Sequence, residues 1–243
     1  MIVPDALLTA QQLFERPHWS LLAGTPIFMV GQVSSPGVGS FGFKGAPGFM
    51  LGVGYQYPLA AHWAVQAEVR GGLSNYLFRY DIPRQSIGSE ADVSGVGSAG
   101  NAFAAFSLEA MYRTPLSTRT FLYGAGGASA NFHIKELIQY VRPDSRIPEI
   151  LQLSLDYLST PNPSFTPYLK LGAGRILANG SALSLELVYQ QGLSQIFQGR
   201  YSFNDAQSGN SITGGQFDAK DSALNLQLRY TFGGAKRSLR KGY

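Results

Sequence analysis

Six charged residues stand in segments where apolar and polar residues alternate. In a β-strand, residues two positions apart share a face, so each charge lies opposite the leucine, valine and tyrosine side chains of its segment. If the segments close into a barrel, the charges face its axis and form a lumen charge network. Its members are Glu68, Arg70, Glu109, Lys170, Glu186 and Arg229.

Three carboxylates and three cations inside one closed sheet have two chemical uses. We expect Glu68, Glu109, Glu186 and Arg229 near one depth, with Arg70 and Lys170 a few residues further along. The charges can pair as salt bridges that close the interior, because buried charges must be compensated. They can instead hold water and form a proton or small-ion path, or a gated pore. Both uses stay open.

The histidines are the candidates for acid–base chemistry. His18 and His62 are expected at one rim of the barrel and His133 at the other, in the same region as Ser129 and Asp144. A lipid-A-modifying enzyme would need such a histidine, serine and acidic residue within hydrogen-bond reach. Serine and aspartate are common in loops, so we expect no enzyme. No metal-ligand spacing and no phosphate-binding loop is present, so we expect no cofactor.

Eight segments carry the alternation, over roughly ten to fourteen residues each. They are longer than typical strands of globular sheets and long enough to cross a bilayer when tilted. The predicted strands are 18–31, 48–57, 62–77, 102–113, 119–132, 165–177, 182–197 and 221–232. In 119–132 glycines blur the alternation, so its outward residues could be Phe121, Tyr123 and Ala125 or the opposite set.

Composition indicates that the apolar face of these strands meets lipid. A soluble barrel needs an outer face rich in lysine and glutamate, yet only 14% of the residues are charged. The positions that alternate with the leucines are mostly small or polar, which suits a narrow, packed interior. Aromatic residues gather near the strand ends, as they do at membrane interfaces.

The connections alternate in length along the chain. Long, polar loops are predicted at 32–47, 79–101 and 198–220, together with a fourth at 133–164, and short turns separate them. The turn with Asn179 and Gly180 has the strongest hairpin signal. This alternation is typical of outer-membrane barrels. We therefore predict an all-β fold: an eight-stranded antiparallel up-and-down transmembrane β-barrel with short periplasmic turns, long extracellular loops and both termini in the periplasm.

The loop 133–164 is unusually apolar. Leu151, Leu153 and Leu155 alternate as in a strand, whereas the spacing after Pro148 also fits a helix. The segment could fold over the barrel mouth or lengthen the neighbouring strands. It could instead dock a protein, since exposed apolar patches mark interaction sites. The residues predicted to bind a partner are Ile138, Tyr140, Ile150, Leu151, Leu155 and Tyr157.

The last predicted strand resembles a known signal. In 221–232, leucines followed by Tyr230 and Phe232 alternate with polar residues. This resembles the aromatic-ended last strand that the Gram-negative barrel-assembly machinery reads, although eleven residues follow Phe232. The whole chain resembles the OmpA-type and PorT-type eight-stranded barrel families. We therefore predict a non-enzymatic, anchored interaction or assembly component of an envelope complex for secretion, transport or signalling, which docks a partner through the loop 133–164. The PorT-type resemblance implies that this partner is a secretion or envelope-assembly machine.

Two alternative functions remain. One is a small-solute channel or transporter through the charged lumen, and the less favoured one is a lipid-A-modifying enzyme. The expected surroundings are outer-membrane lipid and lipopolysaccharide, with a protein partner in an envelope complex. A net charge of +4, scattered along the chain, gives no reason to expect a nucleic-acid partner.

Bulk composition sets the domain organisation. The 243 residues, with a mean hydropathy of −0.03, fit one barrel domain at 18–233. Residues 1–17 are expected to form a periplasmic segment or short helix, and 234–243 a basic tail. No run of 18 apolar residues predicts a transmembrane helix, and the absence of cysteine excludes disulfides. Residues 1–20 lack a secretory signal, so we expect a mature or excised chain, or one whose targeting sequence lies upstream.

Overall fold

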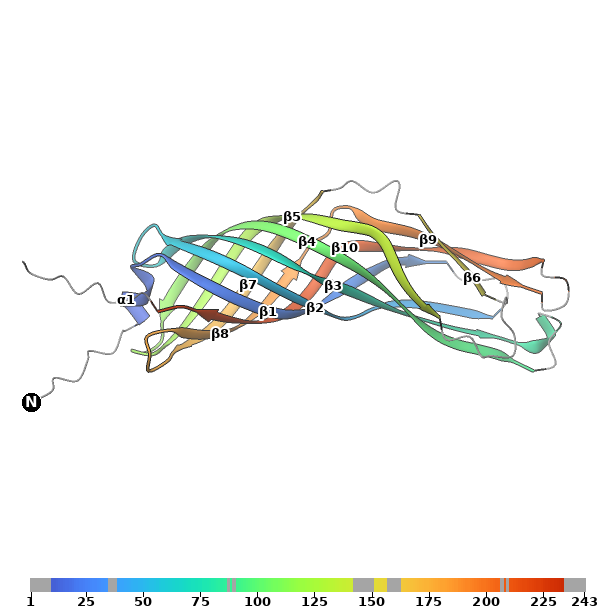
Figure 1. Cartoon of the computed structure of the whole chain (residues 1–243), viewed down its shortest axis with the longest axis horizontal. Coiled ribbons are helices and arrows are strands. Elements are labelled where there is room, and N and C mark those ends of the chain that lie inside the picture. Colours follow the sequence, from blue (N-terminus) through green and yellow to red (C-terminus); the bar gives the residue numbers. More distant parts are fainter. Residues whose placement is uncertain are drawn as a thin grey trace, which may run out of the picture.

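A computed structural model describes residues 10–34, 39–86, 88, 91–141, 151–156, 163–205, 208 and 210–233. It contains one short α-helix, one 3₁₀ turn at Arg84–Ser86, and ten strands (Figure 1). The elements are α1 (Ala10–Phe14), β1 (His18–Val33), β2 (Ser40–Pro58), β3 (Trp63–Ile82), β4 (Val93–Pro115), β5 (Thr120–Val141), β6 (Leu151–Asp156), β7 (Ser164–Ile176), β8 (Ala182–Gln190), β9 (Gln195–Asn204) and β10 (Ser211–Thr231). Among these residues no helix is long and apolar enough to cross a membrane.

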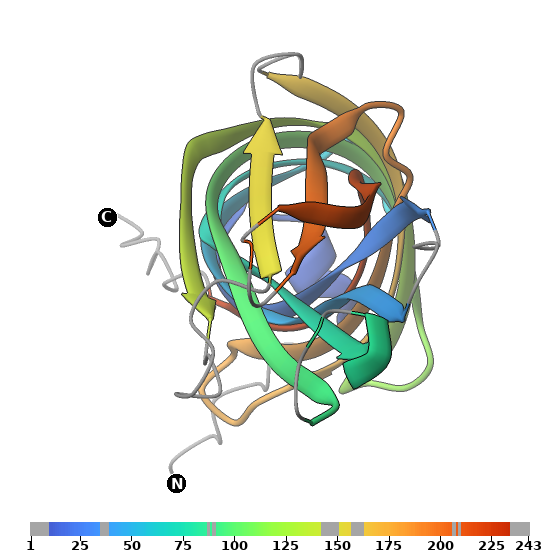
Figure 2. The ribbon, with the colours of Figure 1, turned by 90° about the vertical axis from the view of Figure 1, so that its right-hand side faces the viewer.

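Eight of the strands close into an antiparallel barrel, seen end-on in Figure 2. The ring runs β1-β2-β3-β4-β5-β7-β8-β10, and β10 pairs back with β1. That closing pair extends from Ser20 opposite Thr231 to Val33 opposite Phe217. The predicted eight-stranded up-and-down barrel is therefore confirmed.

The barrel has two unlike ends. At the short-turn end, tight turns join β2 to β3, β4 to β5, and β7 to β8 (59–62, 116–119 and 177–181). Gly180 in the last of these turns has φ +80°, a conformation that favours glycine and explains the Asn179–Gly180 pair. The opposite, long-loop end carries the projecting halves of the strands (Figure 1).

At the long-loop end, the sheet is extended by two strands outside the ring. The first half of β10 pairs with β9, from Ser211 opposite Asn204 to Lys220 opposite Gln195. The strand β6 then pairs with the other edge of β9. The predicted strand 182–197 is thus wrong in its last part, because β8 ends at Gln190 and β9 starts a separate hairpin.

The half of the barrel next to the short turns carries an outward apolar surface, here called the lipid-facing belt. Its side chains are exposed although they are large and apolar: Leu51, Val69, Leu108, Leu169, Leu171, Leu185, Leu187, Leu226 and Leu228. Aromatic residues mark its short-turn rim: Trp19, Tyr55, Tyr57, Trp63 and Tyr112. Such a surface is stable against hydrocarbon, and an aromatic rim suits the membrane interface. The predicted outward facing of leucine and tyrosine is confirmed.

In the half next to the long loops, the large apolar side chains face inward and the small or polar ones face outward. On β2 and β3 the buried, inward residues include Phe41, Phe43, Tyr76 and Phe78, while glycine, Lys44 and Arg79 face outward. The predicted long loops 32–47, 79–101 and 198–220 are therefore wrong in extent, because most of these residues continue the strands. Polar outward residues made these extensions look like loops.

Two further segments differ from or refine the predictions. In β5 the inward residues are Phe121, Tyr123 and Ala125, so the opposite set, with Leu122, faces lipid. Part of the predicted loop 133–164 is strand, since β5 continues to Val141 and β6 covers Leu151–Asp156. This agrees with strand lengthening there. The tail 234–243 lies outside the described residues.

Candidate functional site in the barrel lumen

The lumen charge network fills the middle of the barrel. Alternation places its members on the inward faces of β3, β4, β7, β8 and β10, and each side chain is almost fully buried. The Lys170 Nζ lies 2.8 Å from Glu68 Oε1 and 2.8 Å from Glu109 Oε1. It also lies 3.9 Å from Glu186 Oε2. One ammonium group therefore contacts carboxylates from three strands.

Arg229 forms the second centre of the network. Its Nε donates to Glu186 Oε1 at 2.5 Å and its Nη2 donates to Glu186 Oε2 at 3.0 Å. The same Nη2 also pairs with Glu68 Oε1, so Glu68 is shared between Lys170 and Arg229. The Arg229 Nη1 donates to Ser20 Oγ at 2.8 Å. Because Glu68 pairs with both cations, a cation can exchange one carboxylate for another and still keep an ion pair.

Neutral groups complete the polar layer. Tyr168 donates its hydroxyl to Glu109 Oε2 at 2.8 Å, and Tyr123 donates to Glu186 Oε1. Arg70 lies at the edge of the network, with its Nε 3.9 Å from Glu68 Oε2 and its Nη2 donating to Ser129 Oγ at 3.2 Å. The structure thus brings all six predicted residues together, with three carboxylates facing three cations.

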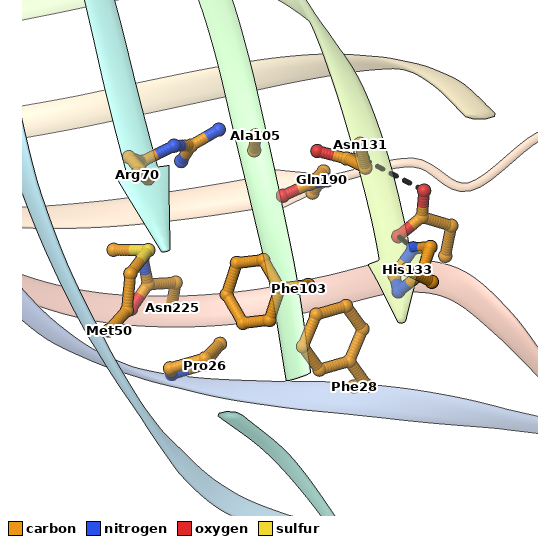
Figure 3. A pocket seen from close by; sticks show the side chains of 11 residues that line it. Pro26, Phe28, Met50, Arg70, Phe103, Ala105, Asn131, His133, Gln190 and Asn225 are labelled. Carbon is orange, nitrogen blue, oxygen red and sulfur yellow. Dashed lines mark hydrogen bonds and ion pairs between the residues drawn. The ribbon is translucent and has the colours of Figure 1, made fainter. Parts of the chain in front are cut away.

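A cavity lies on the long-loop side of the network, here called the upper cavity. Phe28, Met50 and Phe103 form its apolar wall, and Asn225 and Arg70 line its polar side (Figure 3). The Oδ1 of the buried Asn225 has no hydrogen-bond partner among the described residues. The cavity therefore places aromatic rings next to a buried amide and a buried cation, in a space about large enough for a water molecule.

His133 lies in the wall of the upper cavity, close to the aromatic ring of Phe103. Its Nε2 lies 3.3 Å from Asp221 Oδ1 (Figure 3). The Asp221 Oδ2 accepts a hydrogen bond from Asn131 Nδ2 at 2.8 Å and another from Ser164 Oγ. Sequence reasoning missed Asp221 as the partner, because it is 88 residues away from His133 and no local spacing connects them.

Only part of the enzyme-like combination predicted as an alternative lies within the described residues, so that alternative stays a prediction. Ser129 donates its hydroxyl proton to Asn131 Oδ1 at 2.7 Å, and Asp144 lies outside the described residues. His62 and His18 lie at the short-turn end, where the Nδ1 of His62 is 2.9 Å from the carbonyl oxygen of Arg113. In the described part of the chain, no group of three or more acidic or histidine side chains could hold a metal ion.

A second cavity, here called the lower cavity, lies on the short-turn side of the network. Arg229, Tyr123 and Ser184 line it next to the charges, and Leu13 and Phe14 of α1 line it toward the barrel mouth. Figure 2 shows α1 through the ring, at the far end of the barrel from the viewer. The described part of the lumen thus holds a cavity on each side of a layer of ion pairs.

An aromatic cluster fills the interior at the long-loop end. Its rings come from strands on both sides of the barrel: Phe28, Phe41, Phe43, Tyr76, Phe78, Tyr80, Phe103, Tyr201, Phe203 and Phe217. Phe41 stacks on Tyr201 with ring centroids 4.0 Å apart. Tyr201 donates its hydroxyl to the carbonyl oxygen of Ser34 at 2.6 Å, and burial raises the pKa of this phenol.

The residues predicted to bind a partner lie at the edge of the described structure. Ile138 and Tyr140 fall in β5, and Leu151 and Leu155 fall in β6. Ile150 and Tyr157 lie outside the described residues. The strands place four of these positions in the extension at the long-loop end, and the docking role stays a prediction.

Comparison with known proteins identifies the fold. The crystal structure of the outer membrane protein OprG from Pseudomonas aeruginosa is similar over 90% of this chain and 98% of that chain, with a TM-score of 0.50 and 14% sequence identity. The chain therefore has the eight-stranded fold of outer-membrane β-barrels. This fold agrees with the predicted location in the outer membrane, and the periplasmic position of both termini stays a prediction.

Other outer-membrane barrels align less well with this one. AlkL in lipid bilayers has a TM-score of 0.41 and 14% identity, covering 97% of this chain and 98% of that chain. Ail from Yersinia pestis has a TM-score of 0.31 and 12% identity, with coverage of 89% and 100%. No family model and no curated protein matches the sequence. The likeness to OprG supports the fold alone, so the function is argued from the site.

Proposed function

We propose that this outer-membrane barrel conducts small solutes and that the present structure is its closed state. The observation that carries the proposal is the placement of one thin ion-pair layer between two lumen cavities. A barrel that serves only as an anchor has no need for this layer, since well-packed apolar residues stabilise an interior at least as well as buried ion pairs. Of the functions left open by the sequence, the small-solute channel fits the lumen best.

The layer opens by exchange of partners. Lys170 contacts Glu68 and Glu109 at 2.8 Å and has Glu186 in reach at 3.9 Å. Movement of Lys170 toward Glu186 would leave Glu109 with its bond from Tyr168 and make room for water on one side of the lumen. Each cation keeps a carboxylate during the exchange, which limits the electrostatic cost of opening.

Solutes would enter from the long-loop end through the aromatic cluster. Aromatic side chains offer apolar area, and a buried amide, Asn225, and a buried cation, Arg70, line the upper cavity. This combination suits small molecules with an apolar body and a polar group. In the proposed orientation, the short turns and both described chain ends face the periplasm, as in other outer-membrane barrels.

The proposal includes lipid and lipopolysaccharide around the belt and contains no catalytic step. The anchored component predicted from the apolar loop depends on residues 133–164, where the side chains that would bind a partner are not described. A partner that docks there would be compatible with a channel, and the two roles are tested separately.

Planar-bilayer recordings test the channel. Glu109→Gln removes one carboxylate from Lys170 and weakens the closed arrangement, so we expect more frequent openings than in the unchanged barrel. Glu15→Gln, at an exposed position, is the matched control and should behave like the unchanged barrel. Recordings without openings for any of the three proteins, each folded by heat-modifiable gel mobility, would contradict the proposed function.

A further inference from the structure

The helix α1 lies in the mouth of the barrel without being part of its wall. We infer that α1 is a tethered plug, a segment of this chain that binds the short-turn mouth and can be released from it. The binding site is the barrel's own: an apolar pocket for two side chains, next to a buried arginine that donates to a backbone carbonyl oxygen of the helix. That release affects conduction rests on the proposed function, but the binding itself does not.

Apolar contacts hold one face of α1. Ala10, Leu13 and Phe14 are almost fully buried. They pack in a cluster with side chains from four strands of the wall: Met111, Phe121, Tyr123, Ala125, Ile176 and Ala182. The Phe14 ring meets Phe121 edge to face, with centroids 5.4 Å apart and planes at 90°. Phe14 therefore acts as an aromatic anchor in a pocket that the barrel provides.

The barrel also binds the carboxyl end of the helix. Arg113, on β4, donates from Nη2 to the carbonyl oxygen of Phe14 at 2.7 Å, and its guanidinium lies 4.4 Å from the centre of the Phe14 ring. The ring of His18 contacts the carbonyl oxygen of Leu13. Carbonyl groups at a helix end lack hydrogen-bond partners within the helix. Arg113 and His18 provide these partners from the barrel.

The segment can leave without breaking the barrel. A helix of five residues is not stable alone in water, so its conformation depends on the pocket. Residues 15–17 connect the helix to β1. At its amino end, Ala10 N donates a backbone hydrogen bond to Thr118 O at 3.1 Å. No strand pairing involves α1 in the described structure. Water can hydrate Arg113 when the helix departs, which compensates for the lost carbonyl group.

The plug closes the lower cavity. Leu13 and Phe14 line that cavity on one side, and Ser184 and Arg229 line it on the other. A probe bound at Ser184 therefore reports whether the mouth is open, whatever the charge layer does. The chain contains no cysteine, so a single Ser184→Cys change gives a unique thiol.

The test measures the labelling rate of Ser184→Cys by a water-soluble maleimide in detergent-solubilised, folded barrel. Phe14→Ala and Leu13→Ala should each raise this rate about tenfold, because they remove a buried anchor of the plug. Leu59→Ala is the matched control for Leu13→Ala, since Leu59 is exposed on a turn at the same end. It should leave the rate unchanged.

A synthetic peptide with the sequence of residues 1–17 gives a second measurement. Added to the Phe14→Ala barrel, it should restore slow labelling, and a Phe14→Ala peptide should not. Equal labelling rates in all folded variants, or no effect of either peptide, would overturn the plug. Faster labelling without any conductance in bilayers would support the plug and refute the proposed channel.

Discussion

The two halves of the barrel bury opposite kinds of side chain along the same strands. On β3, the belt half exposes Val69 and Leu73 and buries Glu68 and Arg70. Ten residues further on, the same strand buries Phe78 and Tyr80 and exposes Arg79. The pairing of β3 with β4 is continuous across this change. The change from polar to apolar inward residues therefore comes from the residue types and not from a shift in strand register.

The inversion indicates where the membrane ends. A strand exposes apolar residues where its surroundings are hydrocarbon, and buries them where its surroundings are water. The belt half is thus shaped by lipid outside and polar side chains inside, whereas the long-loop half resembles a water-soluble barrel with an apolar core. The lumen changes from polar to aromatic at the upper cavity, which lies where the two halves meet.

The largest expected effect comes from removing a ring from the aromatic cluster. Phe78→Ala should lower the free energy of unfolding by about 3–5 kcal/mol, because it leaves a cavity in a packed core. Phe106→Ala is the matched change on the belt, where the ring is half exposed to lipid. It should cost roughly 1–2 kcal/mol, since lipid fills the space. Urea unfolding in vesicles measures both, and equal losses would contradict a core in the long-loop half.

The second largest difference between the two halves is expected when an outward-facing residue is replaced by arginine. Leu226→Arg, in the middle of the belt, should lower the free energy of unfolding by about 2–4 kcal/mol. Val96→Arg, also outward but in the long-loop half, should change it by less than about 0.5 kcal/mol. Both side chains are about half exposed in the structure, so exposure alone predicts no difference. Similar losses at the two positions would mean that the membrane extends farther up the barrel.

The strands were predicted well in the belt half and poorly in the long-loop half, because they were read from the alternation of aliphatic residues. Alternating leucines such as Leu183, Leu185 and Leu187 are an unambiguous strand pattern, and their spacing placed Glu186 inward. In the long-loop half, Phe41 and Phe43 alternate with glycine and lysine, which resembles a loop when read for apolar content. Alternation of aromatic with polar residues was the signal that could have extended these strands.

The candidate site was predictable in its membership and not in its pairing. Alternation put the six charged residues on one side of the wall, and the closed ring brought them together. Which carboxylate Lys170 contacts depends on the stagger between strands, a quantity that residue patterns do not contain. The pair His133 and Asp221 and the docking of Phe14 depend on contacts between distant segments, so they required the structure.

The smallest expected effect concerns a single hydrogen bond in the long-loop half. Tyr201→Phe removes the hydroxyl that donates to the carbonyl oxygen of Ser34 at 2.6 Å and keeps the ring that stacks on Phe41. The loss should be about 1 kcal/mol, because the carbonyl group loses its partner while the packing stays. Tyr57→Phe, at the exposed short-turn rim, is the control and should leave the free energy of unfolding nearly unchanged. If Tyr201→Phe is also neutral, water replaces the hydroxyl at the exposed Ser34, and this hydrogen bond does not stabilise the long-loop half. The Phe78→Ala loss would then be the decisive measurement for a packed core in that half.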